Sequence, residues 1–271
     1  MNAATRRHAR DVELVMDRPW STVWRLDGGL WRKQCKSIWR FEPQLTASLA
    51  ARWPDRMPEV VDYGDDWLLM RDAGAMIEDV PGAHELWLEA IGRYAELQRG
   101  EIAHVDEHLA AGVPDQRLAV LPRDYADMLE RDELPWREGQ RDRMRRFEPH
   151  FAQLCAALDD VSSIQHDDLH IHNVYEGPRI LDWGDSCIAH PFFSLVVTFN
   201  FVKTGRDEIR DAYLESYGGD REEFDRALRV GKIVHLFKWI RIRDVLPDEE
   251  LAKYDGWFVG WIDEAVAQTD E

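Results

Sequence analysis

Two neighbouring segments near the middle of the chain constrain its fold more than any other feature. Residues 166–173 read HDDLHIHN, and residues 180–185 read ILDWGD. Between them, two short β-prone runs flank residues 176–178, whose Gly and Pro favour a tight connection. We therefore expect a hairpin that brings Asn173 and Asp182 to neighbouring strand ends.

The spacing of three polar residues in these segments is typical of phosphoryl transfer. Asp168 is followed by Asn173 at the fifth position, and Asp182 is followed by an aromatic residue and Gly, as in kinases. Transfer of a phosphoryl group spreads charge over oxygens that are already anionic, so Mg²⁺ must bridge them. An amide oxygen, a carboxylate, phosphates and water suit the octahedral preference of Mg²⁺. The pattern predicts that Asn173 and Asp182 hold Mg²⁺ and that Asp168 is the base facing the acceptor hydroxyl.

Two other interpretations of the same residues remain open. A segment rich in Asp and His is also typical of a solvated loop whose Asn and Asp side chains cap turns. In addition, Asp168 alternates with three histidines between residues 166 and 172, so on an extended strand these side chains would share a face. Such a set could bind zinc or iron in a metal-dependent hydrolase or oxygenase, although Asn173 would then be unexplained. A simpler role for His166 is a hydrogen bond to the backbone that holds the loop.

The two segments resemble the catalytic motif of the aminoglycoside phosphotransferase and choline kinase-like family of small-molecule kinases. The resemblance extends over about residues 20 to 198. It implies an α+β, two-lobed, protein-kinase-like fold, with a small antiparallel-sheet lobe containing one helix and a larger, mainly helical lobe. We expect the first lobe, with the hinge, at residues 1–74 and the second at residues 75–271. It also implies ATP and Mg²⁺ as cofactors, and as acceptor the hydroxyl of an aminoglycoside, aminosugar, sugar or amino alcohol.

The same resemblance assigns nucleotide-binding residues in the first lobe. Residues 30–33 (LWRK) resemble the strand that carries the family's phosphate-binding lysine, here Lys33, and Glu42 opens a predicted helix as its partner. Lys33 is favoured over Lys36 because strand alternation places it on an inward face, where a lysine needs an anionic partner. Residues 67–74 resemble the hinge. The hinge residues expected to offer backbone groups to adenine are Met70, Arg71 and Ala73.

Several departures from the family pattern concern the shape of the loop. Asp167 stands where the family commonly has Gly, and residues 171–172 replace Pro-Gly; Asp and His adopt glycine-like backbone angles less readily.

Other departures lie outside this loop. Ser194 stands where the family often has an Asp after the metal-binding segment, so an anchoring ion pair is expected to be missing. Residues 18–23 lack a Gly-rich phosphate loop, which argues against a protein kinase. These changes leave open a catalytically inactive regulatory protein that binds nucleotide.

The segment after residue 74 shows mainly helical periodicity and is expected to wall the acceptor pocket. Asp185, three residues after Asp182, could touch a second Mg²⁺, bind the acceptor or cap the next turn. Aromatic pairs four residues apart, such as Trp257 and Trp261, share a helix face and favour core packing, with a pocket for a sugar or ammonium group as the alternative. The predicted helices include residues 85–99, 123–131, 139–158, 221–245 and 248–267.

Composition limits the classes of partner and the cellular compartment that we expect for this protein. The chain has 271 residues, 45% of them hydrophobic, which is enough for a full core. Its net charge of −18 disfavours nucleic acid and suits a cationic acceptor, although the same carboxylates also serve solubility. No run is long enough to span a membrane, no apolar signal core follows the basic N-terminus, and the three scattered cysteines suggest reduced thiols. We expect a cytoplasmic globular enzyme, and the sequence does not predict its oligomeric state.

Overall fold

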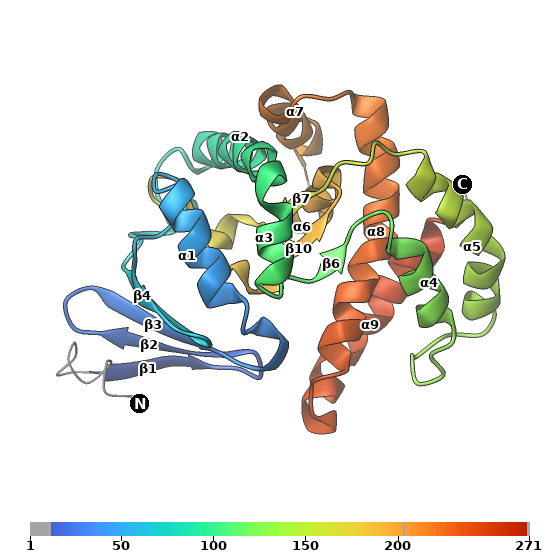
Figure 1. Cartoon of the computed structure of the whole chain (residues 1–271), viewed down its shortest axis with the longest axis horizontal. Helices are drawn as coiled ribbons and strands as arrows, with labels where there is room; N and C mark the ends of the chain where they lie inside the picture. The colour runs from blue at the N-terminus through green and yellow to red at the C-terminus, as the bar shows by residue number, and fades with distance from the viewer. Residues whose placement is uncertain (1–11, 203, 270–271) are drawn as a thin grey trace.

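The computed structural model of the protein describes residues 12–202 and 204–269. Its N-terminal lobe is a five-stranded antiparallel sheet with the strand order β1-β2-β3-β5-β4 and one helix, α1, packed over it (Figure 1). The central strand β3 pairs with β2 along its whole length and with β5 from Leu30 to Gln34. The elements of this lobe are β1 (Val12–Asp17), β2 (Ser21–Leu26), β3 (Leu30–Cys35), α1 (Glu42–Arg52), β4 (Val60–Tyr63) and β5 (Trp67–Arg71).

Local sequence explains the central hairpin of this sheet. Strands β2 and β3 pair up to Leu26 and Leu30, and the connection contains Gly28 and Gly29 with φ values of 73° and 68°. Glycine adopts this left-handed conformation without a Cβ clash, as tight hairpin connections require. Because the register is fixed by this turn, Lys33 points to the buried side of the sheet, where it is 8% exposed.

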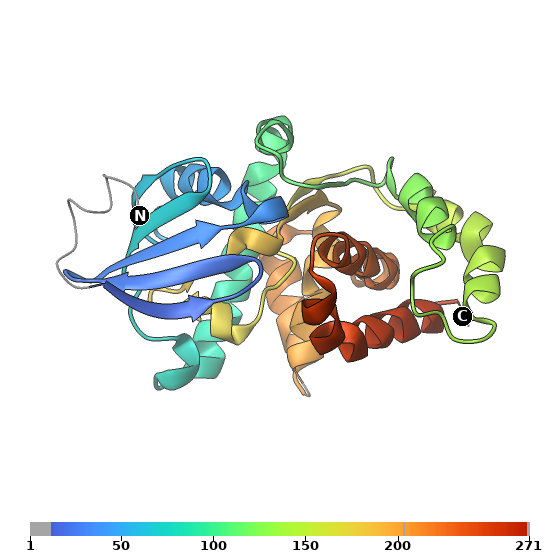
Figure 2. The ribbon, with the colours of Figure 1, turned by 90° about the horizontal axis from the view of Figure 1, so that it is seen from below.

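The C-terminal lobe is mainly helical, and its two long helices α8 and α9 lie side by side (Figures 1 and 2). Helix α2 packs against α7, and most of the hydrophobic core lies in this lobe. In the described residues, no helix is both long and apolar enough to cross a membrane. The helices are α2 (Ala83–Glu101), α3 (Val105–Ala110), α4 (Leu121–Leu129), α5 (Gln140–Ala156), α6 (Leu195–Phe201), α7 (Arg206–Tyr217), α8 (Arg221–Arg243) and α9 (Asp248–Ala267).

Short strands and 3₁₀ turns connect the helices, and those between α5 and α6 carry the polar segment. One small sheet has the order β6-β10-β7, and β8 and β9 form a separate hairpin. The strands are β6 (Asp115–Gln116), β7 (Ser163–Gln165), β8 (Val174–Tyr175), β9 (Arg179–Ile180) and β10 (Cys187–Ala189). The 3₁₀ turns are Ser37–Trp39, Ile77–Asp79, Ile102–His104, Ile171–Asn173, Trp183–Asp185 and Pro191–Ser194.

The predicted α+β, two-lobed fold is confirmed, and the longer helices lie where periodicity predicts them. Helix α9 spans the expected residues, and α8 ends at Arg243, two residues before the predicted end. Helix α6 was not predicted, because five of its seven residues are buried and its sequence LVVTFNF has no polar face to reveal helical periodicity. The division at residues 74 and 75 stays a prediction.

Candidate active site

The expected hairpin is present and brings the two proposed metal ligands to adjacent strand ends. Strand β8 pairs with β9, with Val174 opposite Ile180. Beyond that pair, the amide of Leu181 donates to the carbonyl of Asn173 at 2.9 Å. Asn173 therefore lies just before β8, and Asp182 follows Leu181 on the facing strand end.

Asp168 and Asn173 contact each other directly. The Nδ2 atom of Asn173 donates to the backbone oxygen of Asp168 at 2.9 Å and to its Oδ2 at 3.2 Å. This orientation leaves the Oδ1 atom of Asn173 as a potential metal ligand. The Asp168 side chain is about one third exposed and lines a cavity of about 610 Å³. Thr198 fixes the loop of residues 166–173, because its hydroxyl donates to the carbonyl of Leu169 at 2.7 Å.

Lys33 joins the two lobes through carboxylates from each. Its Nζ atom lies 2.6 Å from Oε1 of Glu42 on α1 and 2.5 Å from Oδ1 of Asp182. Burial alone would lower the pKa of Lys33, but the charges of Asp182 and Glu42 outweigh it and raise that pKa well above its usual range. The charge of Lys33, opposed in part by burial, lowers the pKa of Asp182. Both partners of the Lys33–Asp182 contact are therefore charged at neutral pH.

The backbone around Asp182 allows the hairpin to approach α1 closely. Asp182 has a φ of 64°, which is uncommon for a residue with a side chain and is a feature of constrained functional sites. Gly184 is required by the same approach, because a Cβ atom there would lie 2.9 Å from Oε2 of Glu42. Between them, Trp183 is fully buried, and its Nε1 atom donates to the carbonyl of Ile180 at 3.1 Å. Trp183 thus anchors the turn that carries Asp182.

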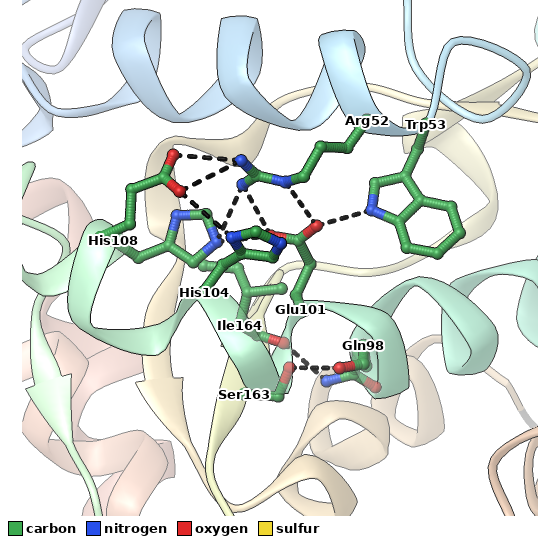
Figure 3. Close-up of polar contacts among 9 residues, drawn as sticks. Arg52, Trp53, Gln98, Glu101, His104, His108, Ser163 and Ile164 are labelled. Carbon is green, nitrogen blue, oxygen red and sulfur yellow. Dashed lines mark hydrogen bonds and ion pairs between the residues drawn. The ribbon is translucent and has the colours of Figure 1, made fainter.

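An ion pair between Arg52 and the buried carboxylate of Glu101 fixes the other end of α1, as Figure 3 shows. The last residue of the helix, Arg52, donates to both carboxylate oxygens of Glu101 at 2.8 and 2.7 Å. Glu101 also accepts from Nε1 of Trp53 at 2.6 Å and contacts Nε2 of His108 at 2.7 Å. Because Glu101 ends α2, this network ties the helix that carries Glu42 to the C-terminal lobe. No local sequence pattern predicts this contact, since Arg52 and Glu101 are 49 positions apart.

Asp167 adopts the glycine-like conformation that its position in the loop requires, with a φ of 55°. Its Oδ1 atom lies 3.1 Å from Nδ1 of His235, and its carbonyl accepts from Nζ of Lys238 at 2.6 Å. Both partners are buried on α8. The departure from Gly at this position is therefore accommodated by a buried histidine and lysine. Lys238 was missed in the sequence, although a lysine inside the apolar run IVHLFKWI signals a buried charge that needs a partner.

Asp185 already has a partner for each carboxylate oxygen. Its Oδ1 atom accepts from Nε1 of Trp39 at 3.1 Å, and its Oδ2 atom accepts from Nζ of Lys238 at 3.3 Å. Asp185 lines the same 610 Å³ cavity as Asp168. It therefore links the 3₁₀ turn before α1 to α8 at the edge of that cavity.

Ser194 makes only uncharged hydrogen bonds at the position where the family often has an Asp. The anchoring ion pair was expected to be missing there. The hydroxyl of Ser194 lies 2.9 Å from that of Tyr94 and accepts from Nε2 of Gln98 at 2.8 Å. It also donates to Oε1 of Gln165. Ser194 thus connects α2 to β7 by buried hydrogen bonds, without a charged group.

The alternating histidines do not converge on one point. The Nε2 atom of His166 donates to the carbonyl of Leu181 at 2.8 Å, which holds the loop against the hairpin. His172 instead pairs with Glu78, with Nδ1 and Oε2 2.6 Å apart. Among the described residues, no three His, Cys, Asp or Glu side chains are placed to hold one metal ion. A zinc or iron site built on His and Asp thus has no support in the described part of the chain.

Two cavities meet at Lys33 and Asp182, both of which line each of them. The smaller cavity, of about 300 Å³, lies between the sheet and the hairpin and contains the three hinge residues predicted from the sequence, Met70, Arg71 and Ala73. The amide of Arg71 donates to the carbonyl of Glu59 at 3.0 Å, and that of Asp72 to the carbonyl of Gly29 at 2.8 Å. The apolar walls of this cavity include Val23, Leu68, Met70, Tyr175 and Leu181.

Solved structures of small-molecule phosphotransferases share this fold. The GDP and kanamycin complex of APH(2″)-IIIa matches with a TM-score of 0.68 at 17% identity, covering 96% of this chain and 94% of that one. A choline/ethanolamine kinase family protein from Mesorhizobium loti matches with a TM-score of 0.64 at 17% identity, covering 99% and 95%. The macrolide 2′-phosphotransferase MphH from Brachybacterium faecium matches with a TM-score of 0.59 at 14% identity, covering 98% and 95%.

Sequence comparison places the chain in a family. No match to a curated protein reaches significance. The model of the phosphotransferase enzyme family, however, matches residues 40–227, which include Glu42, residues 166–173 and the hairpin. The protein therefore belongs to the phosphotransferase enzyme family.

Proposed function

We propose that the protein transfers the γ-phosphoryl group of ATP to a hydroxyl group of a small molecule. The observation that carries this proposal is the meeting of two cavities at Lys33 and Asp182, with Asp168 facing the larger cavity. A nucleotide in the smaller cavity would place its phosphates at this junction. An acceptor in the larger cavity would then present its hydroxyl to Asp168 on the opposite side.

The donor atoms at the junction suit Mg²⁺. Asp182 offers a charged carboxylate, and Asn173 offers an amide oxygen on the adjacent strand end, which is the hard oxygen set that Mg²⁺ prefers. When bound, Mg²⁺ would neutralise charge on the phosphate oxygens. Lys33 would contact the phosphates from the sheet side and is held there by Glu42.

Asp168 is proposed as the base and orienting group. Its hydrogen bonds from Asn173 hold the loop, and its partial exposure keeps the carboxylate accessible to an acceptor. A carboxylate at this position aligns the incoming hydroxyl and accepts its proton as the phosphoryl group is transferred.

The hinge contact to adenine is proposed for Ala73. Among the predicted hinge positions, the amide of Arg71 is already bonded to Glu59, and the strand pairing of β5 occupies Met70. Ala73 lies beyond the last pair of the strand and lines the smaller cavity. Since APH(2″)-IIIa was solved with GDP, both ATP and GTP belong in the binding experiment.

A regulatory protein that binds nucleotide without transfer is less well supported than the kinase. That alternative rested on the altered loop glycine and on the absent downstream Asp. His235 and Lys238 accommodate Asp167 in the required conformation, and Ser194 at the downstream position makes buried hydrogen bonds. The two can be separated by isothermal titration of ATP with and without Mg²⁺, followed by an ADP-release screen against hydroxyl compounds. Mg²⁺-dependent binding with acceptor-stimulated ADP release is expected, whereas binding without release by any acceptor would contradict the proposal.

A further inference from the structure

The turn between β1 and β2 in the N-terminal lobe contacts α9, the helix that forms one wall of the larger cavity. We infer that Trp20 in this turn and Tyr254 on α9 are positioning residues, which couple nucleotide binding between the lobes to the placement of the acceptor wall. The inference rests on the proposed function, because it assumes that a nucleotide binds between Lys33 and Asp182.

Trp20 is held to the strand that carries Lys33. Its carbonyl accepts from the amide of Lys36 at 2.9 Å, and Lys36 directly follows β3. The side chain of Lys36 also donates to the carbonyl of Arg18 in the same turn at 2.8 Å. The turn and β3 are therefore expected to move together, so that a displacement of Lys33 carries Trp20 with it.

The ring of Trp20 packs between the lobes. Its centroid lies 6.2 Å from that of Trp39 in the N-terminal lobe and 5.8 Å from that of Tyr254 on α9. Both contacts belong to a second apolar cluster besides the main core, at the junction of α8 and α9 that faces the N-terminal lobe in Figure 1. We call it the interlobe cluster, and its members include Trp20, Cys35 and Trp39 from the N-terminal lobe and Ile242, Leu246 and Tyr254 from the C-terminal lobe.

A hydrogen bond joins the interlobe cluster to the proposed nucleotide site. The Nε1 atom of Trp39 donates to Oδ1 of Asp185 at 3.1 Å, three residues after Asp182. Residues 182–185 thus contact the N-terminal lobe at two points, through Asp182 to Lys33 and through Asp185 to Trp39. Separation of the lobes would break both contacts together.

The interlobe cluster and a bound nucleotide favour the same arrangement of the lobes. Separation of the lobes would expose the apolar surface of the cluster to water, which costs free energy. A nucleotide held with Mg²⁺ between Lys33 and Asp182 opposes the same separation. Because a ligand stabilises the arrangement that it binds better, loss of the cluster should weaken nucleotide binding, although Trp20 and Tyr254 do not line the smaller cavity.

The same contact reaches the acceptor wall through α9. Tyr254 lies about two helical turns before Trp261, and both line the larger cavity. The ring centroid of Trp261 lies 3.9 Å from that of His235, which contacts Asp167 beside the proposed base. One helix thereby connects Trp20 to the loop of the proposed base. Because thermodynamic coupling is reciprocal, a nucleotide in the smaller cavity should also restrain α9.

Amide hydrogen exchange of the full wild-type chain tests the coupling without a variant. Mg²⁺ with AMP-PNP, a non-hydrolysable ATP analogue, is expected to slow exchange in the N-terminal half of α9 by about threefold or more, although no described residue of α9 lines the smaller cavity. Helix α7 is the internal control, because its residues line neither cavity. Unchanged exchange in α9 with nucleotide bound, or equal slowing in α7, would overturn the coupling alone. Absence of AMP-PNP binding, measured calorimetrically on the same sample, would overturn the proposed function as well.

A set of variants tests whether Trp20 and Tyr254 act through one contact. In calorimetric titrations with Mg²⁺ and AMP-PNP, Trp20→Ala and Tyr254→Ala should each bind about fivefold more weakly than wild type, and the double variant should bind no more weakly than Trp20→Ala. Tyr254→Phe keeps the ring and should bind as wild type does.

Tyr63→Ala is the matched control for these variants. Tyr63 is a half-exposed aromatic residue of β4 that lines neither of the two cavities, so its loss should change the Kd by less than about twofold. Losses that add in the double variant, wild-type affinity in Trp20→Ala, or an equal loss in Tyr63→Ala would overturn the role of the contact.

Discussion

The Nζ atom of Lys33 on β3 lies 2.5 Å from Oδ1 of Asp182, which follows β9 in the other lobe. The two residues are 149 positions apart, and the contact closes the site across the lobe boundary. Because Glu42 holds Lys33 from α1, the position of the lysine depends on the sheet, the helix and the hairpin together.

Replacement of Lys33 should therefore impair the use of nucleotide more than replacement of a lysine on the exposed side of the sheet does. Lys33→Met removes the cation that both carboxylates face, and we expect kcat/KM for ATP to fall about 100-fold or more. Lys36→Met is the matched control, because Lys36 pairs with Asp17 on the exposed side of the sheet. Steady-state kinetics and Mg²⁺-ATP titration measure both variants, and equal losses in the two would contradict the role of Lys33.

Asp168→Asn should separate binding from transfer. The amide is nearly isosteric and cannot accept the hydroxyl proton, so kcat should fall about 100-fold or more while the Kd for Mg²⁺-ATP stays within about twofold. Single-turnover kinetics with a saturating acceptor measure the transfer step. Turnover equal to that of wild type would remove Asp168 from the role of base.

The network at the end of α1 should contribute to stability. Arg52→Ala leaves the fully buried carboxylate of Glu101 without its bidentate partner, and loss of one side of such a pair costs about 3 kcal/mol. Arg71→Ala is the control, since Arg71 and Glu59 form an exposed pair worth less than about 1 kcal/mol. Urea unfolding measures both. A loss in Arg52→Ala no larger than in the control would show that the network does not hold α1.

Glu101 should also make stability depend on pH within a defined window. Burial alone would raise its pKa, but hydrogen bonds from His108, Arg52 and Trp53 outweigh it and lower the pKa from 4.5 to about 2. Because the folded-state pKa is the lower one, the stabilisation is complete above about pH 4.5 and is lost as the pH falls toward 2. Glu101→Gln should therefore cost more unfolding free energy at about pH 6 than at about pH 3. An equal cost at the two pH values would refute this assignment.

Lys238 and Asp167 should behave as a coupled pair. Lys238→Met leaves the carboxylate of Asp167 buried beside His235 alone, which should cost about 3 kcal/mol of unfolding free energy and lower kcat by displacing the loop. Asp167→Gly added to this variant removes the buried charge and suits the φ of 55°, so part of both losses should be recovered. A double-mutant cycle measures the coupling, and strictly additive effects would show that the two residues act independently.

The parts of the site that are close in sequence could be predicted, and the parts assembled by the fold could not. Asp168, Asn173 and Asp182 lie within 15 positions, so spacing and a single hairpin suffice to place them together. Lys33 and Glu42 follow from strand alternation and the start of one helix. By contrast, Lys238 meets Asp167 across 71 positions, and Arg52 meets Glu101 across 49, so no local pattern links them.

The sequence also could not predict how the backbone conformation of Asp167 is stabilised. The sequence suggests that Asp167 fits poorly where Gly is common, because a side chain disfavours a positive φ. The structure shows how the position is tolerated, through two buried partners on a helix about 70 residues away. Such compensation depends on tertiary packing and cannot be read from the loop alone.

Transfer of a phosphoryl group from ATP to an acceptor hydroxyl forms a phosphomonoester, which ³¹P NMR of the reaction mixture detects. Wild-type protein, Mg²⁺-ATP and a hydroxyl acceptor should give a new phosphomonoester resonance together with ADP, and Asp168→Asn should give neither at a comparable rate. ADP with inorganic phosphate alone, or unchanged ATP with every acceptor despite Mg²⁺-dependent binding, would contradict phosphoryl transfer to an acceptor.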